Sequence, residues 1–136
     1  MTPEQRKQFL EDNRYCVVGY DRSDGPPALS PVYYVMDGDD VLISTKGGRA
    51  KGRVLAKRPE VSVCILSEKH PSAPYLTIYG TATVVKEGAV DVMMRVGGAM
   101  SGNEIPEAAR PALEKRAEEE DRVVIRVTPE RYVYRD

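Results

Sequence analysis

The 136-residue sequence contains no tryptophan, one phenylalanine, one histidine and two cysteines. His70 is isolated and no Cys-x-x-Cys spacing occurs, so the clustered ligands of a zinc site are absent and no metal site is predicted. Cys16 and Cys64 each lie within an apolar run. We expect both to pack as small apolar side chains in a reducing compartment.

Long apolar runs are also missing. No stretch approaches the roughly 20 apolar residues that span a bilayer, and residues 1–7 lack the apolar region of a signal peptide. These absences predict a cytoplasmic protein with no membrane partner. The formal net charge is -1, which argues against a general nucleic-acid binder.

The pattern of short apolar runs predicts a mainly β fold. Turn residues separate the runs, as in small antiparallel barrels. We expect one domain over residues 1–136, with antiparallel strands flanked by short helices. Gly80, in the middle of the longest strand, predicts a bulge or a sharp bend. The expected strands are 15–20, 28–36, 41–45, 61–66, 75–85, 122–128 and 131–134, with a turn at Pro129-Glu130.

Four helices are expected around these strands. The first runs from about residue 3 to 12, with Thr2 as its cap and Pro3 at its first position. A second, short helix starts near residue 50 and ends before Pro59. The others cover 88–100, where Gly97-Gly98 should weaken the end, and 106–121, which Pro111 should disturb.

The most informative stretch is 44–59, which contains two hydroxyl side chains and six cations. An apolar strand leads into Gly47-Gly48 and then into the short helix. The start of a helix offers unpaired N–H groups and a partial positive charge to an anion. The stretch therefore indicates a phosphate-binding turn. The plainer alternative is a solvated basic surface, and the stretch matches neither the phosphate-loop nor the dinucleotide-binding motif.

The order of motifs resembles the pyridoxamine-5′-phosphate-oxidase-like split β-barrel family, which binds flavin or deazaflavin. Within that family the chain is most similar to the small actinobacterial oxidoreductases that use the deazaflavin coenzyme F420. The resemblance covers about residues 15–134. It rests on 25–32, on the Arg-Ala-Lys of 49–51, on Arg58-Pro59, on the Gly-Thr-Ala of 80–82 and on 121–127.

The resemblance implies a FMN- or F420-binding split barrel and a set of cofactor-binding residues. Ser44, Thr45, Arg49 and Lys51 would bind the cofactor phosphate, and the strand around Pro31 would run beneath the ring system. Some relatives have a tryptophan before the long strand, where this chain has Tyr75 as its nearest aromatic. The implied cofactor contacts are Ser30, Pro31, Val32, Ser44, Thr45, Lys46, Arg49, Ala50, Lys51 and Tyr75.

The function implied by the resemblance is an F420-dependent oxidoreductase that transfers a hydride to a small organic acceptor. A homodimer with cofactor sites between its subunits is implied as well. FMN remains an alternative cofactor, and a non-catalytic flavin- or deazaflavin-binding protein remains an alternative function. No acid–base pair or nucleophile is visible in the sequence, and no catalytic residue is assigned.

Overall fold

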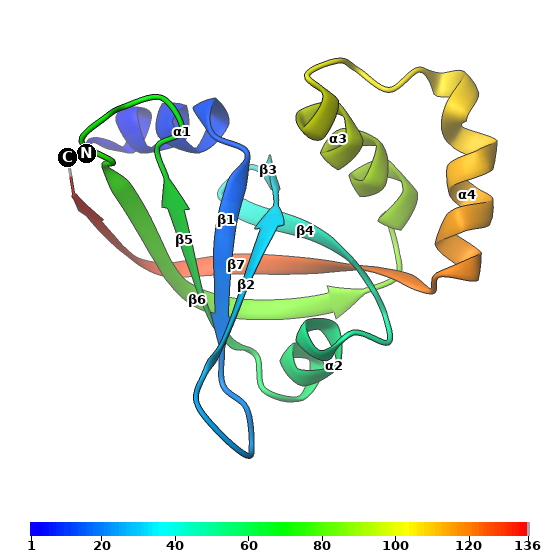
Figure 1. Cartoon of the computed structure of the whole chain (residues 1–136), viewed down its shortest axis with the longest axis horizontal. Coiled ribbons are helices and arrows are strands. Elements are labelled where there is room, and N and C mark those ends of the chain that lie inside the picture. The colour runs from blue at the N-terminus through cyan, green and yellow to red at the C-terminus, as the bar shows by residue number, and fades with distance from the viewer. Residues whose placement is uncertain (136) are drawn as a thin grey trace.

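Seven antiparallel strands form one curled sheet in the computed structural model, which describes residues 1–135 (Figure 1). The strand order across the sheet is β2-β1-β5-β6-β7-β4-β3. This architecture confirms the predicted mainly β split barrel. The strands are β1 Tyr15–Tyr20, β2 Ala28–Tyr33, β3 Val35–Asp37, β4 Asp40–Lys46, β5 Glu60–Leu66, β6 Tyr75–Val85 and β7 Arg122–Arg135.

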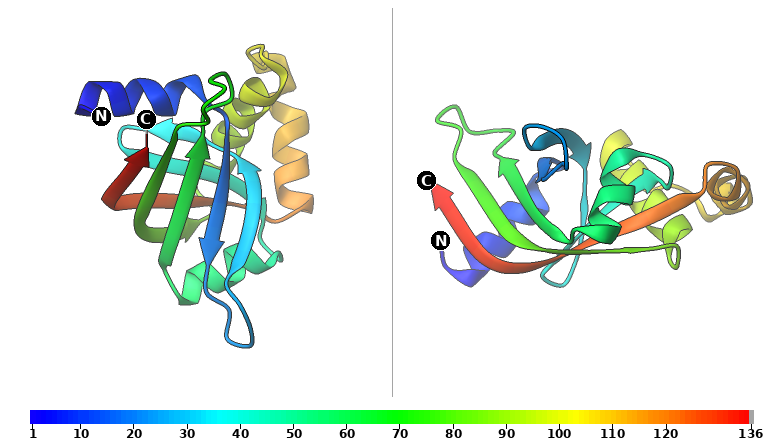
Figure 2. Two further views of the ribbon diagram at one scale, coloured as in Figure 1. Left: turned by 60° about the vertical axis from the view of Figure 1, so that its left-hand side comes forward. Right: turned by 90° about the horizontal axis from the view of Figure 1, so that it is seen from below.

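Two helices close the ends of the curled sheet (Figure 2). Helix α1, Pro3–Asp12, begins with a capping box in which Thr2 and Gln5 bond to each other's backbone, which confirms the predicted start. Helix α2, Ala50–Lys57, lies at the opposite end. Their side chains Leu10 and Leu55 enter the same apolar core as the inward-facing strand residues. The barrel interior is therefore a packed apolar core.

Helices α3, Ala89–Ser101, and α4, Arg110–Glu119, form a hairpin beside the barrel (Figure 1). They connect β6 to β7 and cover part of the outer face of β4 and β7, where Val92 packs with Leu42 and Val124. No helix within residues 1–135 is both long enough and apolar enough to cross a membrane.

The long C-terminal strand corrects one prediction. A turn at Pro129-Glu130 was expected to separate two strands, but β7 is continuous and pairs with β6 from Val124 to Arg135. Pro129 sits opposite Gly80, where the register shifts. A Cβ on Gly80 would lie 2.2 Å from the Thr128 carbonyl oxygen, so only glycine allows this close approach. The predicted bulge at Gly80 is confirmed, and it accommodates the proline within the sheet.

The single strand predicted over 28–36 is divided in two. Tyr34 leaves the ladder between β2 and β3, and its buried hydroxyl donates a hydrogen bond to the Leu10 carbonyl at 2.7 Å. As a result β2 pairs with β1, whereas β3 pairs with β4. The hydrogen bond that the buried Tyr34 phenol makes across the core therefore replaces its place in a continuous strand.

One expectation about helix breakers is also corrected. Pro111 lies in the first turn of α4, where its missing N–H costs nothing, so it starts the helix and does not disturb it. Gly97 and Gly98 lie near the end of α3, which continues to Ser101, and the weakening of that end stays a prediction. A Cβ on Gly97 would lie 3.2 Å from a side-chain carbon of Ile105, so this glycine allows the chain after α3 to pack closely.

Candidate functional site

A cavity of about 530 Å³ lies between β2, the end of β4, the start of α2 and the α3–α4 hairpin. It contains five of the sequence-predicted contacts, and its wall combines cations and hydroxyls with an apolar surface. The lining residues from the barrel and α2 are Val32, Tyr33, Ser44, Thr45, Arg49, Lys51 and Arg122. Those from the hairpin are Met93, Val96, Gly97, Met100, Ile105, Ala109, Ala112, Leu113 and Arg116.

The turn from β4 to α2 places the polar residues in this cavity. The N–H of Gly47 donates a hydrogen bond to the Asp121 carbonyl at 2.8 Å, which fixes the turn against the start of β7. A Cβ on Gly47 would lie 2.6 Å from that carbonyl oxygen, so the contact requires glycine. Helix α2 then begins after Arg49, and no side chain caps its first turn. Its first N–H groups thus have no side-chain acceptor.

Two buried hydroxyls in the cavity wall lack partners. Ser44 Oγ and Thr45 Oγ1 are inaccessible to solvent and make no hydrogen bond to any residue among 1–135. Burying an unsatisfied hydroxyl costs a fold roughly 1–3 kcal/mol. Two adjacent residues with this defect, both at the wall of one cavity, indicate that they donate to a ligand. An anion is the natural acceptor for two hydroxyls and a helix start.

Lys51 supplies the charge beside these hydroxyls. It is only 8% exposed, and no carboxylate within residues 1–135 forms an ion pair with it. Burial lowers the pKa of Lys51, and the nearby guanidinium groups of Arg49 and Arg122 lower it further. A cation that is buried among other cations destabilises the fold unless an anion joins it. Lys51 therefore points to the same ligand chemistry as the two hydroxyls.

The opposite wall of the cavity is apolar. Met93, Val96 and Met100 come from α3, and Leu113 comes from the facing side of α4. Met100 is 53% exposed, so the apolar wall continues to the rim of the cavity. The arrangement suits a ligand with an anionic end near Lys51 and a flat or apolar body along the hairpin.

Tyr33, Arg116 and Arg122 also line the cavity, and the sequence did not identify them. Tyr33 follows Val32 directly, and its ring lies 4.7 Å from that of Tyr15 between centroids. The neighbouring Tyr15 hydroxyl raises the pKa of Tyr33, so this phenol stays protonated at neutral pH. Arg122 lies opposite Lys46 in the β4–β7 ladder. This strand register is known only from the structure.

The remaining predicted contacts lie elsewhere. Ser30 and Pro31 belong to β2 but are not part of the cavity wall, and Ala50 faces a second groove. Lys46 forms an ion pair with Glu120 at 3.4 Å. Tyr75 starts β6, where the Arg135 guanidinium lies 5.5 Å from its ring centroid. A cofactor role for these residues stays a prediction.

The second groove, also of about 530 Å³, lies on the other side of α2. It runs between α2 and the loop after β1, and Asp24 is the one carboxylate of its lining within the described chain. Its cations form no ion pair with a carboxylate in residues 1–135. The groove is lined by Tyr20, Arg22, Ser23, Asp24, Ala50, Arg53, Val54, Lys57 and Arg58.

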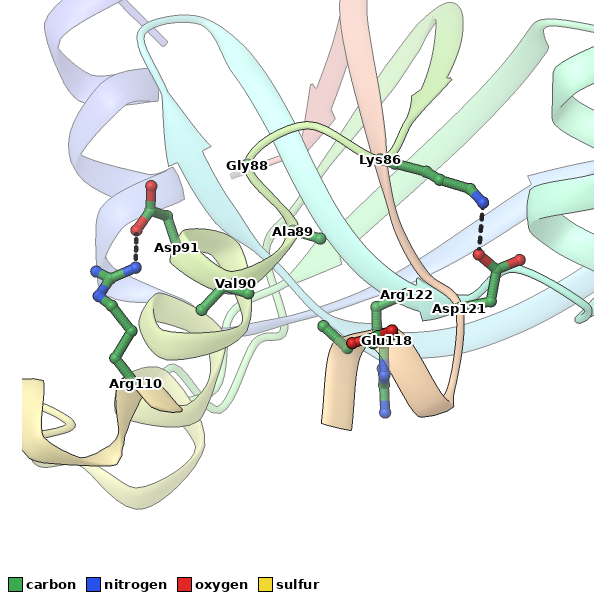
Figure 3. Close-up of a pocket in the computed structure, with 10 residues that line it drawn as sticks. Lys86, Gly88, Ala89, Val90, Asp91, Arg110, Glu118, Asp121 and Arg122 are labelled. Carbon is green, nitrogen blue, oxygen red and sulfur yellow. Dashed lines mark ion pairs between the residues drawn. The ribbon is translucent and has the colours of Figure 1, made fainter. Parts of the chain in front are cut away.

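A third cleft, of about 620 Å³, has a different character (Figure 3). Two ion pairs cross it, Lys86 with Asp121 at 2.7 Å and Arg110 with Asp91 at 2.8 Å. Its lining contains three cations and three carboxylates, so its charges balance in number. Each of the three cations is paired with a carboxylate of the described chain, Arg122 with Glu120 outside the cleft, in contrast to Lys51.

Comparison with known proteins gives a family and a set of structural neighbours. The family model described as pyridoxamine 5′-phosphate oxidase matches residues 2–136. No curated protein sequence matches the chain. The solved structures compared with it below are 16–21% identical to it, so they bear on the fold alone.

Three of these neighbours show the range of the fold. A conserved hypothetical protein from Mycobacterium tuberculosis aligns with a TM-score of 0.86 at 20% identity, over 100% of this chain and 85% of its own. A protein described as an F420 reductase aligns with a TM-score of 0.74 at 21% identity, over 93% and 94%. The heme storage protein HutZ from Vibrio cholerae aligns with a TM-score of 0.69 at 16% identity, over 96% and 91%.

Proposed function

The chain belongs to the pyridoxamine 5′-phosphate oxidase family, and on that premise we propose that it is an oxidoreductase that binds coenzyme F420 and reduces a small organic acceptor. The proposal rests on two buried polar groups in the cavity. Thr45 Oγ1 and Lys51 are buried without partners among residues 1–135, at the polar end of a cavity whose other wall is apolar. A phosphate attached to a planar ring system satisfies both ends.

The residues present fit the phosphate of such a cofactor. Ser44 and Thr45 each offer a hydroxyl donor, Lys51 offers a compact charge, and Arg49 offers a planar guanidinium. The first N–H groups of α2 lie beside them. Hydrogen bonds to a charged partner contribute roughly 1.5–3 kcal/mol each. These groups therefore anchor and orient the anionic end of the cofactor.

The apolar wall of the cavity is suited to the ring system of the cofactor. Val32 and Tyr33 on β2 and the side chains of Met93 and Val96 on α3 would hold the ring system. When bound, the reduced deazaflavin supplies the hydride that the acceptor receives. The protein excludes water from one side of the ring and leaves the rim near Met100 accessible to an acceptor.

The basic groove beyond α2 favours F420 over FMN. FMN ends in its phosphate, whereas F420 continues into a chain of carboxylates. Arg22, Arg53, Lys57 and Arg58 line a groove that flanks the same helix whose start binds the phosphate. Each exposed ion pair contributes little, about 0.2–1 kcal/mol, but several act together along such a chain. An FMN-dependent oxidoreductase and a non-catalytic binding protein are the alternatives.

We expect a homodimer with the cavity at the subunit interface. The edge strand β2 carries Leu29, which is 74% exposed, close in sequence to the cavity residues Val32 and Tyr33. Exposed apolar side chains next to a binding site are typical of surfaces that a second chain covers. Light scattering at micromolar concentration should give twice the 15.1 kDa chain mass. A monomer that binds the cofactor fully would contradict this expectation.

Turnover is tested by the fate of the reduced cofactor. Protein loaded with reduced F420 is mixed rapidly with a panel of activated alkenes, quinones and imines, and cofactor oxidation is followed by absorbance. We expect at least one acceptor class to oxidise the bound cofactor faster than the same concentration of free reduced F420. Bound cofactor that every acceptor oxidises more slowly than free cofactor would support the non-catalytic alternative.

A further inference from the structure

Three cations converge on one carboxylate where β7 begins. Arg116 Nε donates to Glu120 Oε1 at 2.7 Å, and Arg122 donates to the same oxygen from Nε and Nη2, both at 3.2 Å. Lys46 Nζ lies 3.4 Å from Glu120 Oε2. The hydrogen bond from Arg116, supported by Arg122, lowers the pKa of Glu120 to about 2. Glu120 therefore remains a carboxylate at any physiological pH.

This cluster keeps an excess of positive charge. Three cations share one carboxylate, and no other carboxylate within residues 1–135 forms an ion pair with them. The Arg122 side chain is only 15% exposed, so water screens its charge poorly. The guanidinium of Arg122 also lowers the pKa of Lys51, which shows that the two charges interact. Arg116 and Arg122, the two members of the cluster that line the cavity, thus add positive charge near Lys51.

Strand register sets the two positions apart. Lys46 lies opposite Arg122, and Ser44 lies opposite Val124, so Lys46, Arg122 and Ser44 occupy one face of the β4–β7 ladder. Thr45 occupies the other face, where its methyl carbon lies near α2 at Gly52. The buried hydroxyl of Ser44, without a partner in residues 1–135, lies on the same face of the ladder as Arg122.

We propose that Arg116 and Arg122 form a second anion-binding position in the cavity, so that the ligand carries two anionic groups a few ångströms apart. The first group binds at Ser44, Thr45 and Lys51, and the second binds at the guanidinium groups of Arg116 and Arg122. The ligand class is a diphosphate, or a phosphate followed by a carboxylate. Only the identification of this ligand with F420 rests on the proposed function, because the two positions themselves are tested with simple anions.

The experiment compares inorganic phosphate with pyrophosphate by calorimetry on the intact protein. The wild type should bind pyrophosphate at least about tenfold more tightly, since it adds a charge-assisted contact. Arg116→Met and Arg122→Met should bring the pyrophosphate affinity close to that of phosphate while changing phosphate affinity less than about threefold. Lys51→Met should weaken both anions.

Two comparisons keep the test specific. Arg110→Met is the matched control, because Arg110 lies on α4 with Arg116 but pairs with Asp91 and Glu107 at the charge-balanced cleft. It should leave both affinities unchanged, which rules out a general effect of net charge. If Arg122→Met unfolds the protein, Arg116→Met decides alone, since its side chain is 56% exposed.

Two outcomes would overturn the second position. One is equal wild-type affinity for phosphate and pyrophosphate. The other is an equal loss of affinity for phosphate and pyrophosphate in Arg116→Met. Either result leaves the proposed function intact if F420 still binds. A selective loss of pyrophosphate in a protein that does not bind F420 would support the second position and overturn the proposed cofactor.

Discussion

Replacing Lys51 by methionine should stabilise the protein and abolish most of its cofactor affinity at the same time. Lys51 is 8% exposed, and it lies near Arg49 and Arg122 with no carboxylate partner in the described chain. Methionine keeps the aliphatic stem and removes the charge, so packing is preserved. We expect the free energy of unfolding of the cofactor-free protein to rise by roughly 1 kcal/mol, which corresponds to a melting temperature higher by about 3–5 °C.

The same substitution removes a charged donor from the proposed phosphate site. A charge-assisted hydrogen bond contributes roughly 1.5–3 kcal/mol, so affinity for F420 and for FMN should fall about 10- to 150-fold. Fluorescence titration measures the affinity, and thermal unfolding without cofactor measures the stability. A gain in stability together with a loss of cofactor affinity is expected for a residue that is retained for binding at a cost in stability.

Lys57→Met is the matched control. Lys57 lies in the last turn of the same helix, is exposed, and lines the basic groove outside the cavity. FMN has no tail to reach that groove, so its affinity for this variant should change less than about threefold, and the melting temperature should barely move. A lower melting temperature in Lys51→Met with unchanged cofactor affinity would show that Lys51 supports the fold and does not bind the phosphate.

Three further predictions concern pH, the basic groove and the bulge. Because the pKa of Lys51 is lowered from 10.5, the unfolded state binds more protons than the folded state between the lowered pKa and 10.5. The stability of the cofactor-free protein should therefore rise with pH over that interval, and cofactor affinity should fall. Unfolding experiments and cofactor titrations at stepwise pH test both. Replacing Arg53 and Lys57 by alanine should remove the dependence of F420 affinity on tail length and leave FMN affinity unchanged; a titration series with defined tails measures this. Gly80→Ala should lower the free energy of unfolding by about 2 kcal/mol or more in denaturant titration, because its Cβ would meet the Thr128 carbonyl at 2.2 Å.

Much of the fold was accessible from the sequence because its signals are local. The alternation of β6, the cap at Thr2 and the stop before Pro59 each depend on a few neighbouring residues. The errors arose where a distant partner decides the outcome. Pro129 reads as a turn until Gly80 is seen opposite it, and Tyr34 reads as a strand residue until its hydroxyl is seen to bond to Leu10.

The same distinction between local signals and distant partners applies to the residues of the candidate site. The sequence identified Ser44, Thr45 and Lys51 because they lie on one strand–turn–helix segment, and the structure brings them to one cavity. It did not identify Arg116 or Arg122, because their approach depends on the β4–β7 register and on the α3–α4 hairpin. It also grouped Lys46 with the binding residues, although Lys46 pairs with Glu120.

The central claim is that the cavity and the adjoining basic groove bind F420. The most direct measurement is a side-by-side titration of the cofactor-free protein with F420 and FMN at low and high salt. F420 should bind more tightly, with an affinity that increases with the number of tail carboxylates and decreases as salt rises. Tighter binding of FMN, or an F420 affinity indifferent to salt and to tail length, would contradict the account.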